Sequence, residues 1–299
     1  MQNYIRIENN EYEIVSDYKG REELRKSFFE LAKKTFGIDF EPWYRNGFWS
    51  EKYIPYSIVH GDKVVANVSV NHMYFQEGSG SVKRYLIQLG TIMTEEAYRN
   101  KGLIRELLER IFEEYETRTE GIYLFGNDSV LNFYPMFGFE AALEYQYTKK
   151  VSITGNQTAC KIPMDSTEDY NNFLERLRTY KAVGAFCMDN DNLLMFYLTS
   201  FLKDCVYYIE EIDTYVVAES EGGTLLLHGI FSAAGVEMEK VIQSFGEKIS
   251  RVVLGFTPEY TDGFEVSVLK EEDSTLFVKG KGLRRFSEEK KMFPLISHA

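Results

Sequence analysis

Apolar positions along residues 85–115 change from a strand-like to a helix-like spacing. A dense apolar run extends from Tyr85 to Met93, and Gly90 inside it indicates a bulge that turns the strand away from its neighbour. Farther on, apolar residues recur at helical spacing with charged residues opposite them: Leu103, Ile104, Leu107, Leu108, Ile111, Phe112 and Tyr115. This stretch therefore predicts a strand, a turn over residues 99–102 and a helix that starts near Leu103.

The rest of the first half alternates between strand and helix patterns. In the strand expected over residues 64–75, Asn67, Ser69 and Asn71 share one polar face, which is a candidate lining of a cleft. Further predicted elements are a strand that begins within residues 1–19, a helix over 22–36, a hairpin of 56–60 with 64–75, and a strand over 121–126.

Residues 40–56 contain more aromatic side chains than a short segment needs to anchor itself. They are Trp43, Tyr44, Phe48, Trp49, Tyr53 and Tyr56. Large rings of this kind either pack in a core or form the wall of a substrate site, and both interpretations stay open.

Basic residues gather at the predicted start of the helix, where acidic residues are usual. A helix N-terminus carries partial positive charge and normally attracts Asp or Glu into its first turn. Here Arg99, Lys101 and Arg105 surround it, and the first acid inside the helix is Glu106. An external anion would complete this arrangement, and Gly102 would let it approach the backbone closely. The alternative is an ordinary turn with chance basic residues.

The same residues resemble a known cofactor loop. Arg99-x-x-Gly102-x-Ile104, preceded by a strand that ends Ile92-Met93-Thr94, is similar to the acetyl-CoA pyrophosphate loop Q/R-x-x-G-x-G/A of the GNAT acyltransferase superfamily. Ile104 departs from the last position, but a Gly-Leu-Ile ending is similar to the two-lobed enhanced-intracellular-survival type. The resemblance implies that acetyl-CoA is bound by Ile92, Met93, Thr94, Arg99, Asn100, Lys101, Gly102, Leu103 and Ile104.

A second match to this family follows at residues 127–139. GNAT enzymes carry a helix with an Asn near its start and a Tyr seven residues later, followed by Gly-Phe; here these are Asn127, Tyr134 and Gly138-Phe139. Pro135 is compatible with a helix that ends near Tyr134. The resemblance implies that Asn127 contributes to the cofactor site and that Tyr134 is the general acid. The alternative for Tyr134 is a buried core tyrosine.

The second half repeats the order of elements of the first. A polar stretch at 154–158 separates an expected catalytic domain, residues 1–152, from a second, degenerate GNAT-like domain, residues 153–299. Ser232 and Glu237 occupy the loop that corresponds to the basic turn, so this copy is expected to lack a CoA site. We predict strands over 205–209, 214–218, 224–231 and 252–256, a helix over 236–245, and a closing hairpin of 264–269 with 274–278.

Taken with the resemblance, these elements predict an α/β (α+β) protein. Two tandem GNAT-like lobes are expected, each with a mixed, mostly antiparallel sheet flanked by helices.

Composition narrows the class of protein further. The chain has 299 residues and a formal net charge of −12, which disfavours nucleic acid as a partner and suits cationic small molecules. Three widely spaced cysteines, the absence of a signal-peptide pattern and an apolar stretch at 193–202 too short to span a bilayer favour a cytoplasmic location without membrane attachment. The four histidines are scattered singly, so no metal site is expected.

The resemblance implies an N-acetyltransferase that moves an acetyl group from acetyl-CoA to a primary amine. The amine is expected on a small cationic molecule or on a lysine or N-terminus of a peptide, and an oligomer is left open. Gln88 stands where some relatives carry a glutamate base, so Glu41, Glu51, His72 and water are open candidates for that role. The missing base keeps a rival hypothesis alive, a non-catalytic CoA-binding or scaffold protein with a GNAT fold.

The last residues, 292–299, form an apolar, uncharged tail that we expect to dock on the protein. One interpretation is packing on the second lobe. In enhanced-intracellular-survival enzymes the terminal carboxylate is the general base, which is the other interpretation, although those relatives reach their terminus through a sterol-carrier-like domain that this sequence does not show.

Overall fold

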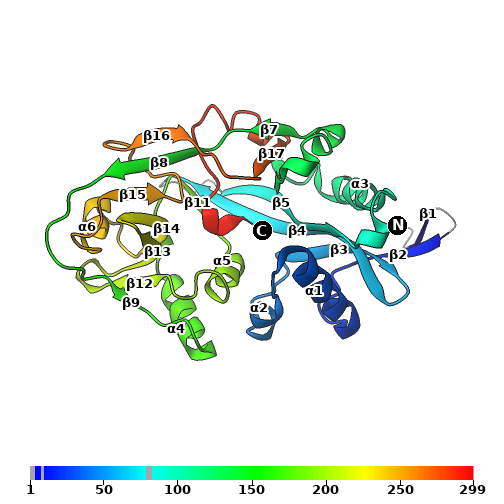
Figure 1. Ribbon diagram of the computed structural model, residues 1–299, viewed down its shortest axis with the longest axis horizontal. Coiled ribbons are helices and arrows are strands. Elements are labelled where there is room, and N and C mark those ends of the chain that lie inside the picture. The colour runs from blue at the N-terminus through cyan, green and yellow to red at the C-terminus, as the bar shows by residue number, and fades with distance from the viewer. Residues whose placement is uncertain (1–3, 8–9, 79–82, 299) are drawn as a thin grey trace.

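The computed structural model describes residues 4–7, 10–78 and 83–298. Its strands form two sheets that lie side by side (Figure 1). The first sheet has the order β1 (Tyr4–Ile7), β2 (Asn10–Ser16), β3 (Tyr53–His60), β4 (Lys63–Glu77), β5 (Lys83–Thr94), β6 (Gly121–Gly126), β17 (Thr275–Lys279) and β7 (Glu140–Ala142), with β11 (Phe186–Met188) beside β4.

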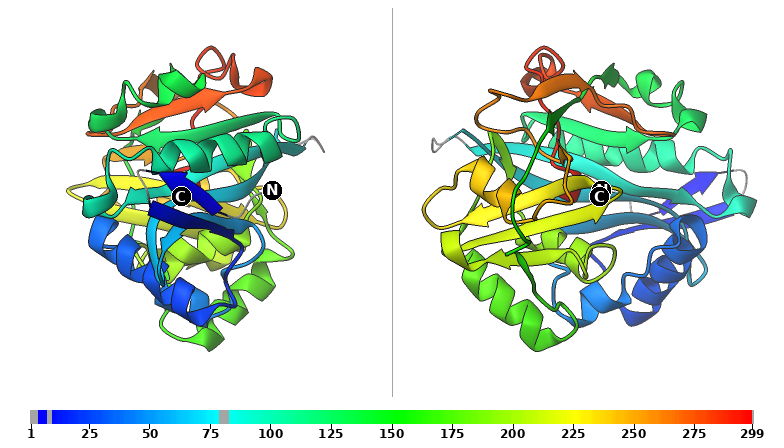
Figure 2. Two further views of the ribbon diagram at one scale, coloured as in Figure 1. Left: turned by 90° about the vertical axis from the view of Figure 1, so that its right-hand side faces the viewer. Right: turned by 60° about the vertical axis from the view of Figure 1, so that its left-hand side comes forward.

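Helices cover both faces of the first sheet. Figure 2 shows α1 (Glu22–Phe36) and α3 (Leu103–Tyr115) on opposite faces, and α2 (Glu41–Arg45) lies beside α1. The apolar side of α1 buries Phe28 and Ala32, whereas α3 buries Leu107 and Ile111. The helix predicted near Leu103 is confirmed, because α3 begins at that residue.

The second sheet contains the remaining strands. Its order is β16 (Glu265–Val268), β8 (Tyr145–Lys150), β15 (Arg251–Leu254), β14 (Thr224–Ser232), β13 (Thr214–Glu221), β12 (Val206–Ile209) and β9 (Cys160–Lys161), with β10 (Lys181–Ala182) beside β14. Helices α4 (Thr167–Leu177), α5 (Asp191–Leu198) and α6 (Met238–Gln243) complete this half. The helix expected over 236–245 is therefore shorter than predicted, but the α/β fold of two mixed, mostly antiparallel sheets with flanking helices is confirmed.

The two sheets exchange strands near the ends of the two halves. Strand β8 leaves the first half and pairs with β15 and β16 of the second sheet. Strand β17 returns to the first sheet and pairs with β6 and β7. The hairpin predicted from residues 264–269 and 274–278 is thus wrong, since its two strands belong to different sheets. The boundary after residue 152 remains a prediction.

The helix expected after Asn127 is also wrong. Residues of this segment form two short 3-10 helices instead, Asp128–Val130 and Tyr134–Phe137. The Asn127 side chain accepts a hydrogen bond from the Ser129 amide and caps the first of them. Pro135 has no N–H to continue an α-helical ladder, so the second turn starts anew at Tyr134.

The C-terminal tail docks, as predicted, but between the two sheets. Phe293 is fully buried and stacks on Tyr123 of β6, with ring centroids 3.9 Å apart. Its amide donates to the Glu144 carboxylate at 2.7 Å, and the Leu295 amide donates to the Gly255 carbonyl at 2.8 Å. The tail therefore contacts both halves, and packing on the second lobe alone does not describe it. None of the helices in the described residues is both long and apolar enough to cross a membrane.

Candidate active site

Strands β5 and β6 separate partway along their length. Their parallel pairing runs from Leu86 opposite Gly121 to Gln88 opposite Tyr123 and then stops. Beyond this point β5 follows β4, with a register shift opposite Asn67–Ser69 and a positive φ of 47° at Thr91. The predicted bulge at Gly90 is confirmed. Parallel strands that diverge leave a crevice at their carboxyl ends, which is where open α/β sheets bind ligands.

A buried polar network holds the bulge in place. The Tyr53 hydroxyl lies 2.8 Å from Thr91 Oγ1 and accepts a hydrogen bond from Ser69 Oγ at 2.9 Å. Asn67 Nδ2 donates to the Thr91 carbonyl and to Ser69 Oγ, both at 2.9 Å. The polar face of β4 therefore fixes the backbone of β5 through Asn67 and Ser69, and only Asn71 of that face lines the crevice.

The crevice opens into a cleft of about 980 Å³ that runs from the start of α3 to the C-terminal tail. It contains every residue that the sequence assigned to the cofactor or to catalysis: Ile92, Met93, Thr94, Arg99, Asn100, Lys101, Gly102, Leu103, Ile104, Asn127 and Tyr134. The structure therefore brings them together in one cavity, while their individual roles remain predictions.

The start of α3 has the geometry of an anion site. Gly102 precedes the helix with a left-handed φ of 79°, and no side chain caps the first amides. Arg99, Lys101 and Arg105 line the cleft at this end. Uncapped amides and three basic side chains suit a phosphate group, because a helix N-terminus supplies both donors and a favourable dipole.

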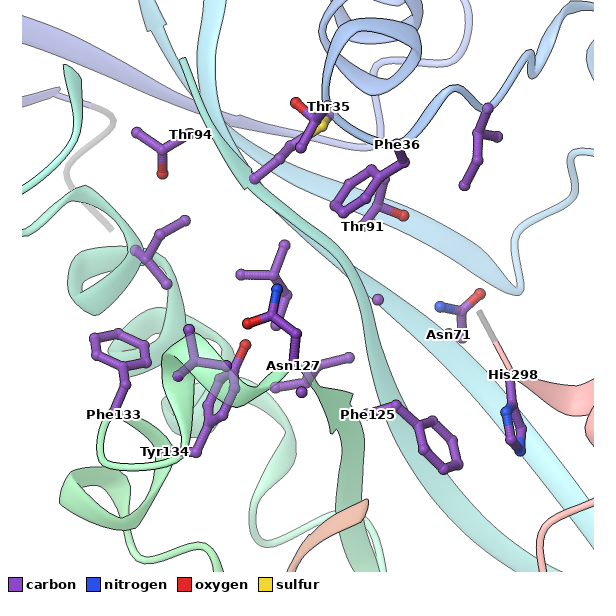
Figure 3. A pocket seen from close by; sticks show the side chains of 18 of the residues that line it. Thr35, Phe36, Asn71, Thr91, Thr94, Phe125, Asn127, Phe133, Tyr134 and His298 are labelled. Carbon is purple, nitrogen blue, oxygen red and sulfur yellow. The ribbon is translucent and has the colours of Figure 1, made fainter. Parts of the chain in front are cut away.

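Tyr134 and Asn127 lie side by side on the opposite wall. In Figure 3 the tyrosine hydroxyl points toward the asparagine side chain. The tyrosine is buried, and its ring packs on Phe277 of β17 with centroids 5.3 Å apart. Burial raises the pKa of the Tyr134 phenol well above its usual value, so it keeps its proton at neutral pH. A protonated hydroxyl facing the cleft can serve as a proton donor.

The far end of the cleft is aromatic. His298 stacks on Phe125 with ring centroids 3.8 Å apart, and its carbonyl accepts a hydrogen bond from the Tyr197 hydroxyl. Figure 3 places Asn71 at the same end as Phe125 and His298. Further rings in the lining are Phe36, Phe40, Trp43, Tyr53, Phe133, Phe196 and Phe201.

The core-packing interpretation of the aromatic segment is confirmed for part of it, and the substrate-wall interpretation stays a prediction. Phe40, Trp43 and Tyr53 are buried and also line the cleft. Sequence reasoning missed Phe196, Phe201 and His298 as lining residues. The apolar run around α5 was noticeable, but nothing in its spacing indicates that it reaches β5.

The proposed bases lie elsewhere. Glu41, Glu51 and His72 are not among the residues that line the cleft. Glu41 pairs with Arg45 at 2.7 Å, and His72 Nδ1 lies 2.6 Å from the Tyr85 hydroxyl. His72 also packs against Tyr115 of α3, on the other face of the sheet.

The matching place in the second sheet is closed. There β14 and β15 pair in parallel from Thr224 opposite Arg251 to Leu227 opposite Leu254. The gap beyond holds residues 182–185, which pair with β14 and reach past β15, and it retains a cavity of only about 40 Å³.

Residues 18–139 match the model of the acetyltransferase (GNAT) family. None of the curated proteins is similar enough in sequence to count as a match. A conserved protein of unknown function from Enterococcus faecalis V583, titled a probable N-acyltransferase, shares the fold with a TM-score of 0.56 at 15% identity, over 92% of this chain and 74% of that chain.

Two further solved structures are similar. A GCN5-related N-acetyltransferase from Kribbella flavida has a TM-score of 0.56 at 15% identity, over 91% of this chain and 71% of that one. Eis1 from Mycobacterium abscessus has a TM-score of 0.54 at 10% identity, over 89% and 72%. These neighbours share the fold of both halves, and the family match supports acyl transfer in general. Over residues 18–139 the chain is thus similar to the acetyltransferase (GNAT) family, and over both halves it shares the fold of these neighbours.

Proposed function

We propose that this protein is an acetyl-CoA-dependent N-acetyltransferase that acts on a primary amine. The observation that carries the proposal is the single cleft. It joins the divergent part of β5, the basic start of α3 and the buried Tyr134. Each of these features supplies one requirement of acyl transfer from a thioester.

In this proposal the cofactor lies along β5 and ends at α3. The pyrophosphate binds the amides and side chains of residues 99–104, where Arg99 and Lys101 supply positive charge. The pantetheine arm follows Ile92–Thr94, because β6 no longer occupies the adjacent edge of β5 there. Backbone amides in this region would stabilise the oxyanion that forms at the thioester carbonyl. Asn127 lies on the opposite wall of the same cleft.

Two proton movements accompany the reaction. The amine nitrogen attacks the thioester carbonyl, the C–N bond forms, and the C–S bond breaks to release a thiolate. Tyr134, which keeps its proton at neutral pH, donates that proton to the thiolate. The amine must also lose a proton. An alkyl amine with a pKa near 10.4 is neutral to only about one part in a few thousand at pH 7.

The group that takes this proton remains unassigned. Gln88 cannot accept it as a carboxylate would, and its amide is buried beside the Tyr123 hydroxyl. A terminal carboxylate as the base remains a prediction, because Ala299 lies outside the described residues. Removing His298 and Ala299 tests it: turnover would be lost while CoA binding is kept.

The decisive experiment measures acetyl-CoA binding and turnover together. Calorimetry gives the affinity, and thiol release with a panel of polyamines, aminoglycosides, simple amines and lysine peptides gives the rate. We expect binding and amine-dependent thiol release. Binding without release for any amine would favour the non-catalytic CoA-binding protein, and no binding at all would overturn the proposal.

A further inference from the structure

The two ends of the cleft differ in chemistry. The basic residues lie at the start of α3, whereas the end nearest α5 and the tail is lined by Trp43, Tyr53, Phe125, Phe196, Tyr197 and Phe201. None of the described residues that line the cleft is an aspartate or a glutamate. A cleft built to hold a polycation would need carboxylates, because a desolvated ammonium group without a counter-charge is costly.

We propose that the acceptor is a primary amine carried on an aromatic body, such as an arylalkylamine, seated between these rings. This inference rests on the proposed function and names the class of its acceptor. Buried aromatic rings contribute large apolar area and prefer stacked or edge-to-face contact with another ring. The acceptor is thus selected by its apolar body rather than by its charge.

Two polar atoms at this end lack a partner within the protein. They are Asn71 Nδ2 and His298 Nε2, both buried and both on residues that line the cleft. Asn71 is 2% exposed, and an unsatisfied polar atom at such a depth costs free energy that a ligand can recover. Figure 3 shows the two side chains at the same end of the cleft, next to Phe125. Both atoms are inaccessible to solvent, so each can contact the polar end of the acceptor only after its side chain turns toward the cleft.

His298 carries a hydrogen-bond acceptor, Nε2, beside the cleft. Its ring bonds the backbone of Phe293, and Nε2 is the nitrogen left without a partner. Burial lowers the pKa of this imidazole to about 4, so the ring is neutral at pH 7 and Nε2 carries a lone pair. The Nε2 atom can therefore accept a hydrogen bond from the N–H of a neutral amine without becoming protonated.

The same surroundings favour the reactive form of the acceptor. Described lining residues that include no Asp or Glu side chain disfavour an ammonium ion and lower the pKa of a bound amine, which raises the fraction of neutral nucleophile. At the rim, Phe36 and Phe201 are 46% and 60% exposed, which gives the entrance an apolar character as well.

The test compares acceptors at saturating acetyl-CoA. We expect kcat/KM for 2-phenylethylamine or tryptamine to exceed that for propylamine, which carries the same charge, by about 10-fold or more, as burial of a ring predicts. Spermidine, an aminoglycoside and a lysine peptide should be poorer still. Equal or better turnover of the polycations would overturn the inference.

Binding of the same amines in the presence of CoA separates this inference from the proposed function. Aromatic amines that bind more tightly than spermidine, without any acetyl transfer, would support the aromatic subsite and refute the enzyme. Acetyl transfer to amines with no preference for aromatic ones would support the proposed enzyme and refute the aromatic subsite.

Variants locate the subsite. His298→Phe keeps a ring against Phe125 but removes Nε2, and we expect an approximately 10-fold higher KM for the amine with an unchanged Kd for acetyl-CoA. Asn71→Asp adds the missing carboxylate and should narrow the preference for aromatic amines over spermidine. Tyr260→Ala, at a side chain 78% exposed and outside the cleft, is the control and should change neither quantity. Because Asn71→Asp does not disturb the tail, an unaltered preference in that variant would contradict the inference even if His298→Phe fails to fold.

Discussion

The two halves of the molecule contain the same divergence of two parallel strands, yet only one of them opens into a cleft. The cleft that begins between β5 and β6 measures about 980 Å³, whereas the cavity beside β14 at the corresponding place measures about 40 Å³. In the second sheet the chain itself bridges the gap. The Val183 amide donates to the Ile230 carbonyl and the Ala185 amide to the Thr257 carbonyl, each at 2.9 Å.

The tail closes the second opening from another direction. An added Cβ at Gly255 would lie 3.0 Å from Leu295, and one at Gly229 would lie 3.1 Å from Ile296. These contacts take the place that a pantetheine arm is proposed to occupy in the first sheet. A CoA site of this kind therefore needs two things: space between the diverging strands, and favourable charge around that space. Ser232 and Glu237 affect only the charge.

The largest expected effect is on acetyl-CoA affinity, and it comes from reversing a charge at the start of α3. Arg99→Glu places a carboxylate where we propose the pyrophosphate binds, and we expect acetyl-CoA affinity to fall on the order of 10²-fold. Lys240→Glu reverses a charge within α6 of the closed half and is the control. If calorimetry gives the Arg99→Glu variant an acetyl-CoA affinity within twofold of wild type, Arg99 does not bind the pyrophosphate.

Next in size is the loss of the proposed acid. Tyr134→Phe should lower kcat by about 10²-fold while the Kd for acetyl-CoA stays the same, because only the proton donor is removed. Tyr207→Phe makes the same change in the second sheet, where the ring packs on Phe245, and should leave kcat unaltered. An unchanged kcat in the Tyr134 variant would return this residue to a purely structural role.

A smaller effect concerns the carboxylate that anchors the tail. Burial raises the pKa of Glu144 to about 8, whereas an unfolded glutamate titrates near 4.3. Between these values the native state binds more protons than the unfolded state, so stability is highest below the unfolded pKa and falls as the pH rises toward 8.

Glu144→Gln removes this titration. We expect the Tm of the wild type to decrease from pH 5 to pH 9 and that of the variant to decrease less. Parallel Tm profiles for the two proteins would show that Glu144 is not held neutral in the native state.

The last prediction is that a change of charge in the second half leaves the number of bound CoA molecules unchanged. Ser232→Arg combined with Glu237→Gln gives the closed half a more favourable charge, but residues 182–185 still fill its slot. Calorimetry should therefore saturate at one CoA per chain for this variant, as for the wild type. Saturation at two would show that charge alone had closed the second site.

Local patterns predicted the elements that local interactions determine. The strand, bulge and helix from Tyr85 to Tyr115 follow from apolar spacing and from Gly90, and they agree with the structure. The helix expected from Asn127 to near Tyr134 failed because it was taken from the family resemblance and not from an apolar helical spacing in this segment. Residues of the basic turn and Tyr134 were found because motifs mark them, although their roles await experiment.

Long-range pairing was not accessible in this way. Residues 264–269 and 274–278 look like neighbours in one hairpin, since a short polar stretch joins them, and nothing local indicates that β17 completes the edge of β6. The aromatic end of the cleft also depends on long-range packing and was not predictable for the same reason. Trp43, Phe196 and His298 come from three distant segments, and only the packed structure places them around one cavity.

The exchange of β8 and β17 makes the two halves depend on each other during folding. A chain cut after residue 152 would carry β8 without β15 and would leave the edge of β6 unpaired. Exposed strand edges of this kind template association with other chains. The exchanged strands therefore couple both halves into one cooperative unit, in which neither half reaches its native state before the chain is nearly complete.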